Sequence, residues 1–136
     1  MKALQFSRYG DAGVLHVAEA DEPHAGPGQV RVRVRAVAVN PIDWKIRSGA
    51  MRDFMPVELP RIPGSDVAGV VDEVGEGVSG VAVGDEVFGA AVGAGAAEYA
   101  VVQAFAAKPA GLSWEEAAGF VTAVETAVRA MDLVGV

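Results

Sequence analysis

The sequence predicts a mainly β fold with short helices, arranged as a sandwich or a partly open barrel. Six valine-rich or alanine-rich segments follow one another, and glycine, proline and aspartate separate them. β-Branched residues favour strands, and the separating residues favour turns. Several short strands with turns between them are typical of sandwiches and barrels. The predicted strands are residues 2–7, 14–20, 29–39, 66–74, 85–91 and 97–102.

The longest of these segments, residues 29–39, is predicted to be a strand with one core face. Alternate residues of a strand point to opposite faces, so the aliphatic positions and the arginines separate. We expect the arginine face to lie in water until valines replace the arginines. The predicted core positions are Val30, Val32, Val34, Ala36 and Ala38. The opposite face carries Arg31, Arg33 and Arg35, followed by Val37 and Val39.

Two helices are predicted, one directly after this strand and one near residue 114. Asn40 is a favourable N-cap, Pro41 suits the first helical position, and Gly49 suits the left-handed residue after a helix. Ser113 and Glu116 have the spacing of a capping box, which predicts a helix or a kinked helix pair over residues 114–133. Its apolar residues recur at helical spacing. They are Phe120, Val121, Val124, Val128 and Met131.

Composition restricts the classes of function. The 136 residues suffice for one domain, and a net charge of −7 argues against nucleic acid as a partner. There is no cysteine, and His16 and His24 have no neighbour at ligand spacing, so we expect no metal. No apolar run is long enough to span a membrane, and residues 1–10 lack the apolar region of a signal peptide. We predict a cytoplasmic protein with no membrane partner.

Residues 75–80 read GEGVSG, which satisfies the G-x-G-x-x-G pattern of dinucleotide-binding turns. That pattern binds a pyrophosphate only where a strand precedes it and a helix N-terminus follows it. The residues after Gly80 are rich in valine and contain the turn signal Gly84-Asp85, so no helix is expected there. We therefore predict a loop between two strands, in which glycines adopt positive φ.

The segments, in this order, resemble the N-terminal half of the medium-chain dehydrogenase/reductase superfamily. The resemblance covers nearly the whole chain and is closest to the zinc-independent quinone oxidoreductase branch, the relatives of zeta-crystallin. Five stretches carry it. They are NPIDWKIRSG from Asn40, IPGSDVAGVVDEVGEGV from Ile62, VGDEVFG from Val83, AEYAVV from Ala97 and ETAVRAMDLVGV from Glu125.

The resemblance implies a GroES-like, partly open β-barrel over residues 1–112, which forms the substrate side of the enzyme. Residues 113–136 would form a helical hinge that leads into a Rossmann domain absent from this chain. The resemblance also implies that no zinc is bound. Zinc-dependent relatives carry a cysteine where Asn40 stands and a histidine-glutamate pair where Ser65 and Asp66 stand.

In full-length relatives NADPH lies between the two domains and reduces a quinone or an α,β-unsaturated carbonyl compound. The resemblance implies that Asn40 lies near the nicotinamide ribose, although a helix cap alone would also explain it. Asp43 and Lys45 are the other candidate catalytic residues, and a favourable helix dipole and an exposed surface lysine are their ordinary alternatives. Thr126, with Thr122 four residues before it on the same helix face, is the remaining candidate cofactor contact.

Two function classes follow. The first is the substrate-side domain of an NADPH-dependent, zinc-free oxidoreductase, which needs a nucleotide-binding domain and is inactive by itself. The second is an orphan GroES-like domain that acts as a non-catalytic binding or assembly module. A third idea, a subunit of a co-chaperonin ring, rests on the fold alone and is disfavoured because the resemblance continues beyond Ser113.

Overall fold

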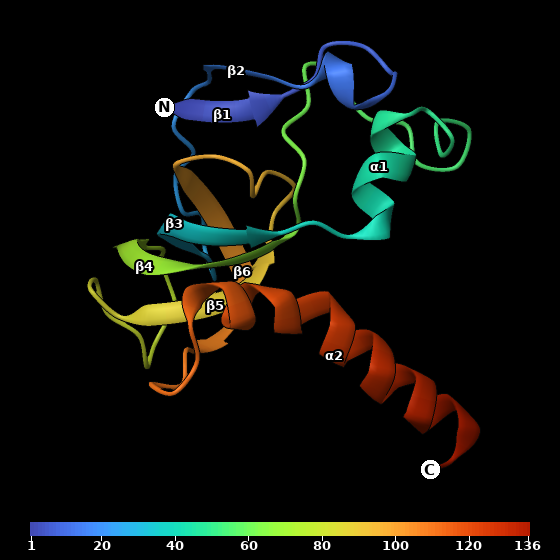
Figure 1. Cartoon of the computed structure of the whole chain (residues 1–136). Helices are drawn as coiled ribbons and strands as arrows, with labels where there is room; N and C mark the ends of the chain where they lie inside the picture. Colours follow the sequence, from blue (N-terminus) through green and yellow to red (C-terminus); the bar gives the residue numbers. More distant parts are fainter.

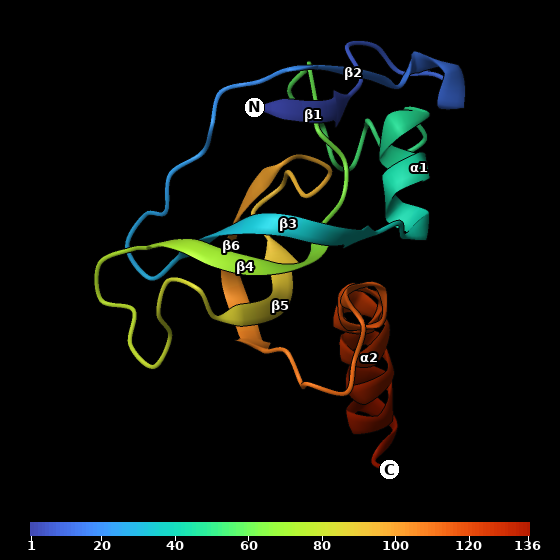
Figure 2. The same cartoon turned by 60° about the vertical axis from the view of Figure 1, so that its left-hand side comes forward.

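The computed structural model describes all residues, 1–136, as a β domain from which one long helix projects (Figures 1 and 2). The sequence therefore predicts the fold class correctly. The elements, in order, are β1 (Lys2–Gln5), the 3-10 helix η1 (Ala12–Val14), β2 (His16–Glu19), β3 (Val30–Ala38), α1 (Pro41–Arg47), β4 (Asp66–Val74), β5 (Glu86–Ala91), β6 (Tyr99–Ala107) and α2 (Trp114–Val134).

Four strands form the barrel. β3, β4, β5 and β6 pair antiparallel in that order, and β3 also pairs with β6 to close the ring. The β3–β6 register joins only residues 30–33 to residues 99–102, so the closing pair covers part of each strand. β1 and β2 form a separate two-stranded sheet that lies above the barrel in Figure 1. An isolated bridge between Ala3 and Ala97 joins β1 to the segment just before β6.

The interior of the barrel is filled mainly by valine. These side chains come from all four strands and are almost completely buried, which is the pattern that alternation along half-buried strands predicts. Their burial supplies the main hydrophobic stabilisation of the domain. The fully buried cluster is Val30, Val32, Val67, Val71, Val87, Ala100 and Val102.

A β-bulge corrects the predicted core face of β3. Val34 pairs with Gly69 and Ala36 pairs with Ala68, so Arg35 is the extra residue of the bulge. An extra residue reverses the alternation that follows it. Val37 consequently packs against the barrel interior, whereas Ala36 and Ala38 pack on the other face, against the cluster that includes α2. The prediction that Ala36 and Ala38 belong to the valine core is therefore wrong.

A second bulge, on β4, corrects the prediction that Arg31 lies in water. Arg31 pairs with Glu73 and Val32 with Val71, so Asp72 is the extra residue and reaches the same arginine. Arg31 donates to both oxygens of Asp72, each at 3.0 Å, and its side chain is only 14% exposed. The hydrogen bond to Asp72 is the main cause that raises the pKa of Arg31.

α2 begins as the sequence predicts and is a single helix, not a kinked pair of helices. Ser113 Oγ accepts from the Glu116 N–H, and the Glu116 carboxylate accepts from the Ser113 N–H at 2.8 Å. The second bond lowers the pKa of Glu116. Ala117 and Ala118 are buried against Ala68 of β4, whereas residues 123–134 are exposed and project from the barrel (Figure 2). None of the helices is long and apolar enough to cross a membrane.

The GEGVSG stretch lies in the loop between β4 and β5, and no helix follows it. This agrees with the predicted loop. Gly77 and Gly80 have positive φ, of 77° and 76°. Gly75 serves another purpose, because a side chain there would collide with the backbone of the turn at residues 26–29. The first glycine of the pattern is thus required for close packing of two loops.

Candidate functional site

The candidate site lies where β3 ends, α1 begins and α2 crosses the barrel. Asn40 follows β3 with extended backbone angles and is the N-cap of α1, and Pro41 occupies the first helical position. Asp43, one turn into the helix, accepts from the Asn40 N–H at 2.7 Å and from the Gly64 N–H at 3.0 Å. Each carboxylate oxygen of Asp43 therefore holds a backbone group, which ties the start of α1 to the segment before β4.

A buried carboxylate, Asp66 at the start of β4, is the centre of this site. The residue is only 1% exposed, and its two oxygens accept four hydrogen bonds. The donors are Asn40 Nδ2 at 2.9 Å, Ser65 Oγ at 3.1 Å, Thr122 N at 3.0 Å and Thr122 Oγ1 at 2.7 Å. A buried charge is tolerated when donors surround it in this way. We call Asn40, Ser65, Asp66 and Thr122 the Asp66 network.

The Asp66 network determines how the Asn40 side chain is oriented. An ionised carboxylate only accepts hydrogen bonds, so the amide nitrogen of Asn40 must face Asp66. The amide oxygen Oδ1 then points away from the carboxylate toward the first turn of α1, where the capping box brings it near the Asp43 N–H. That N–H makes its hydrogen bond to the Asn40 backbone carbonyl, at 3.0 Å. The structure thus presents one acceptor, held on a fixed amide plane, beside the first turn of α1.

The other predicted site residues differ in their exposure to solvent and in their hydrogen-bond partners. The hydroxyl of Thr122 is occupied, because it donates to Asp66. Thr126 is exposed, one turn farther along α2 on the same face. Lys45 is exposed on α1 with its Nζ 5.9 Å from the ring centre of Trp44, an arrangement typical of a surface lysine. Asn40 and Thr122 therefore meet in one network, and Lys45 lies outside it.

Sequence reasoning missed Asp66 as an organising residue. It considered Ser65 and Asp66 only as positions where zinc ligands are absent. One signal was present, since Asp66 opens the apolar stretch DVAGVV, and a carboxylate at the edge of a buried strand needs donors. Apart from the adjacent Ser65, the donors are 26 and 56 residues away in sequence, so no local pattern identifies them.

A cavity of about 170 Å³ adjoins the network. Asp43, Gly64 and Ser65 form the wall that the cavity shares with the site, and apolar side chains from α1 and from the segment before β4 form much of the remainder. No group of three or more histidine, cysteine, aspartate or glutamate side chains is arranged to hold a metal ion. The site therefore offers hydrogen-bonding groups and a partly apolar pocket.

Comparison with known proteins agrees with this architecture. The model of the alcohol dehydrogenase GroES-like domain matches residues 26–112. The chloroplast envelope quinone oxidoreductase homolog of Arabidopsis thaliana is 38% identical over 96% of this chain and 42% of its own length. An NADPH-dependent alkenal/one oxidoreductase of the same plant is 37% identical over 93% of this chain and 36% of its own length.

The solved structure of Escherichia coli quinone oxidoreductase, complexed with NADPH, superposes with a TM-score of 0.75 at 32% identity. The match covers 87% of this chain and 36% of the E. coli chain. The protein therefore belongs to the alcohol dehydrogenase GroES-like domain family, in the quinone oxidoreductase branch of the medium-chain dehydrogenase/reductase superfamily. The chain spans about two fifths of the length of the relatives it matches.

Proposed function

We propose that this chain is the substrate-side domain of an NADPH-dependent, zinc-free oxidoreductase that reduces a quinone or an α,β-unsaturated carbonyl compound. The observation that carries the proposal is the Asn40 amide, which Asp66 orients at the start of α1 within a network whose Ser65 also lines a partly apolar cavity. The names of the relatives support the reaction class, since they include quinone oxidoreductases and an alkenal/one oxidoreductase.

Asn40 and Thr126 are the residues of this chain that fit a nicotinamide cofactor. Asn40 keeps an acceptor oxygen and one amide hydrogen beyond the bond to Asp66, and the exposed Thr126 hydroxyl has no partner within the chain. NADPH, when bound, supplies a hydride to the substrate. This chain would orient the nicotinamide end through Asn40 and Thr126 and would exclude water through its apolar cavity. Asp43 and Lys45 stay candidates, Asp43 through its support of the α1 N-terminus.

The direct test joins this chain to the nucleotide-binding domain of E. coli quinone oxidoreductase. The chimera is expected to reduce a quinone with NADPH, and Asn40→Ala is expected to lower kcat/KM by about 10-fold or more because one positioned polar contact is lost. Gln103→Ala removes another amide, from an exposed position on β6, and should leave the rate unchanged. An Asn40→Ala chimera as active as the unmodified one would contradict the proposed role of Asn40.

NADPH binding by the 136-residue chain alone is expected to be weak, with a Kd no lower than about 1 mM. The chain contributes one wall to the nicotinamide end, and its only G-x-G-x-x-G stretch is a loop without a following helix. Calorimetric titration measures this affinity. Micromolar binding at one site per chain would refute the expectation. Residues 75–80 would then again be a candidate phosphate-binding loop.

Zinc content gives an independent check on the enzyme branch. The purified protein is expected to hold no stoichiometric zinc, since it has no cysteine, and Asn40 and Ser65 both donate to Asp66. Elemental analysis after dialysis measures the content. About one tightly held zinc per chain would overturn the assignment to the zinc-free branch.

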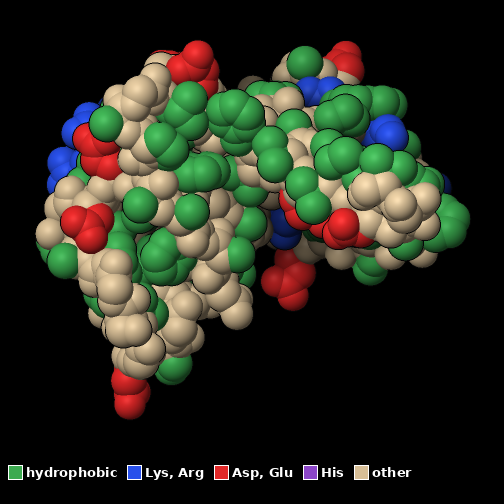
Figure 3. Space-filling view, turned by 90° about the horizontal axis from the view of Figure 1, so that it is seen from below, with side chains coloured by type: hydrophobic (Ala, Val, Ile, Leu, Met, Phe, Trp, Pro, Cys, Tyr) green, Lys and Arg blue, Asp and Glu red, His purple; other side chains and the backbone are tan.

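The alternative function, a non-catalytic binding or assembly module, is favoured by one observation. The outer part of α2 carries an apolar face whose members are between 43% and 46% exposed, and such a face is typical of a surface that another protein part covers. Many hydrophobic side chains are visible when the molecule is viewed from below (Figure 3). The face consists of Phe120, Val124, Val128 and Met131. An inactive but correctly folded chimera would favour this alternative.

The cytoplasmic location stays a prediction, because both plant relatives are named as chloroplast proteins.

A further inference from the structure

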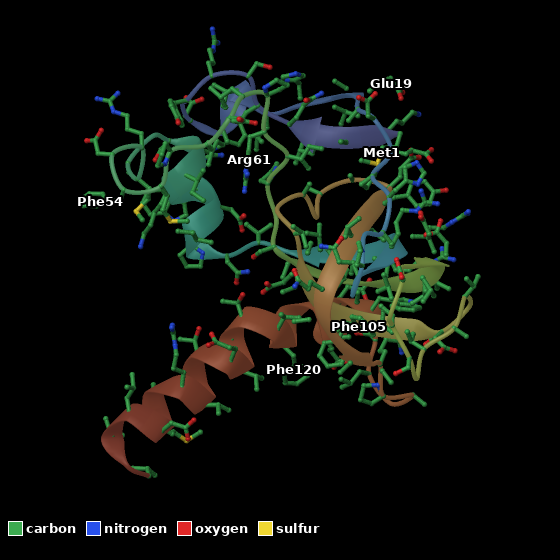
Figure 4. All side chains as sticks on the ribbon, turned by 180° about the vertical axis from the view of Figure 1, so that it is seen from behind. Met1, Glu19, Phe54, Arg61, Phe105 and Phe120 are labelled. Atoms are coloured by element: carbon green, nitrogen blue, oxygen red, sulfur yellow. The ribbon has the colours of Figure 1, made fainter.

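An arginine lines the cavity beside the Asp66 network and has no protein partner. Arg61 lies next to α1, on the segment that precedes β4 (Figure 4). Its backbone is fixed, because Arg61 N donates to Phe6 O at 2.9 Å and Phe6 N donates to Arg61 O at 3.0 Å. Its guanidinium lies over Gly93, with Nη2 and Nη1 at 3.8 and 3.9 Å from the position that a Cβ of residue 93 would occupy.

No acid in the chain neutralises this guanidinium directly. Among all hydrogen bonds and ion pairs of the molecule, none involves the Arg61 side chain, in contrast to Arg31 and its paired carboxylates. Asp43 lines the same cavity, but its two oxygens already accept from the Asn40 and Gly64 N–H groups. Arg47 Nε is the only buried side-chain polar atom without a hydrogen-bond partner. The unpaired nitrogens of Arg61 are therefore not buried, and they are open to solvent and to a ligand.

The cavity is small, and apart from Arg61, Asp43 and Ser65 the side chains that line it are apolar. Ile42, Ile46 and Met55 contribute to its lining together with Phe6. Its volume of about 170 Å³ is below the roughly 300–1,000 Å³ of pockets that enclose whole ligands, so it suits one substituent of a larger molecule. Ser65 of the Asp66 network and the Arg61 guanidinium line the same cavity, together with these apolar side chains.

We propose that Arg61 makes this domain select carbonyl substrates that carry a carboxylate. The guanidinium would bind the carboxylate through paired N–H donors, and the apolar wall would contact the carbon chain between that group and the carbonyl. Such pairing in a partly enclosed cavity is stronger than a surface ion pair, because less water competes with it. The inference rests on the proposed function for the identity of the carbonyl compound, and it adds the acidic group.

Two ligands with the same carbon skeleton, a carboxylate and its uncharged methyl ester, test this selectivity. We suggest titrating the isotope-labelled chain with 4-oxo-4-phenylbutanoate and with its methyl ester, and following backbone amide signals of residues around the cavity. Both probes are saturated ketones, so neither undergoes addition. The acid is expected to bind at least about 10-fold more tightly than the ester, since only the acid makes charge-assisted hydrogen bonds.

Arg61→Met should reduce the ratio of the two affinities to about one while ester binding persists, which also shows that the variant is folded. Arg61→Lys should retain part of the preference, because lysine keeps the charge without the paired donors. The matched control is Arg52→Met, since Arg52 lies in the neighbouring loop with a side chain that is 68% exposed and outside the cavity. It should leave the ratio unchanged.

Equal affinities of the acid and the ester in the unmodified chain would overturn the proposal, as would an equal loss in Arg52→Met and Arg61→Met. The assay uses neither cofactor nor turnover, so its outcome is separate from the chimera experiment. A chimera that reduces quinones beside a chain without acid selectivity would leave the proposed function intact and remove only the role of Arg61.

Discussion

Replacing Asp66 by alanine is expected to lower the free energy of unfolding by about 3–5 kcal/mol. The substitution removes the acceptor of four hydrogen bonds, which come from the Asn40 amide, the Ser65 hydroxyl, and the N–H and hydroxyl of Thr122. Each buried donor that loses its acceptor costs about 1–3 kcal/mol, and the small cavity left by the side chain adds to the loss. Denaturation by urea, followed by circular dichroism, measures the change.

Asp53→Ala is the matched control, because it removes an aspartate whose side chain is 85% exposed. Its effect should stay within about 0.5 kcal/mol. Asp66→Asn should fall between the two, since an amide oxygen still accepts while its NH₂ group faces other donors. If Asp66→Ala were as stable as the control, the network would contribute nothing to folding, and the orientation of Asn40 would need another cause.

Gly75→Ala is expected to destabilise the domain by about 2–4 kcal/mol. A Cβ at residue 75 would lie 2.0 Å from Gly26 O and 2.7 Å from Gln29 O, and both contacts are with backbone. The Gly75 N–H also donates to Gln29 O at 2.9 Å, so the two loops cannot separate without losing that bond. Thermal or urea unfolding of the purified variant gives the size of the effect.

Gly77→Ala provides the comparison within the same loop. A Cβ at residue 77 meets nothing within 4 Å, so only its positive φ of 77° disfavours alanine, at about 1–2 kcal/mol. The first glycine of GEGVSG should therefore be the more sensitive of the two. A larger effect at Gly77 than at Gly75 would show that backbone conformation, and not the contact with residues 26–29, determines the need for glycine.

The strands were predictable wherever their pattern was local. β4 spans the predicted residues 66–74, because its run is rich in valine and Gly75 follows it directly. β6 continues to Ala107, five residues beyond the predicted end, because its alanines are neutral in propensity and only the pairing with β5 makes them a strand. Neither bulge of β3 and β4 was predictable, since a bulge depends on the register with the partner strand.

The site was predictable in part for the same reason. Asn40 was located by the proline that follows it and by its place at a helix start, which are features of neighbouring residues. The role of Asp66 was not predictable, because its main partners are far away in sequence. The proposed role of Arg61 was not predictable either, because it depends on the cavity that the fold creates around it. A single sequence shows a charged residue next to a buried strand, and only the fold shows what faces it.

The bond from the Thr122 N–H to Asp66 has a mechanical consequence for α2. An N–H nine residues into a helix ordinarily donates to the carbonyl four residues earlier, and here a side chain of the barrel accepts it. Asp66 thus fixes one point of α2, and the exposed helix beyond Thr122 is about 18 Å long. A tilt of about 10° about that point moves Val134 by about 3 Å. Thr126 lies about 6 Å from the same point and moves by about 1 Å. Under the proposed function, a displacement of that size would be enough to slow hydride transfer, and Asp66 would set the position of the Thr126 hydroxyl without touching it.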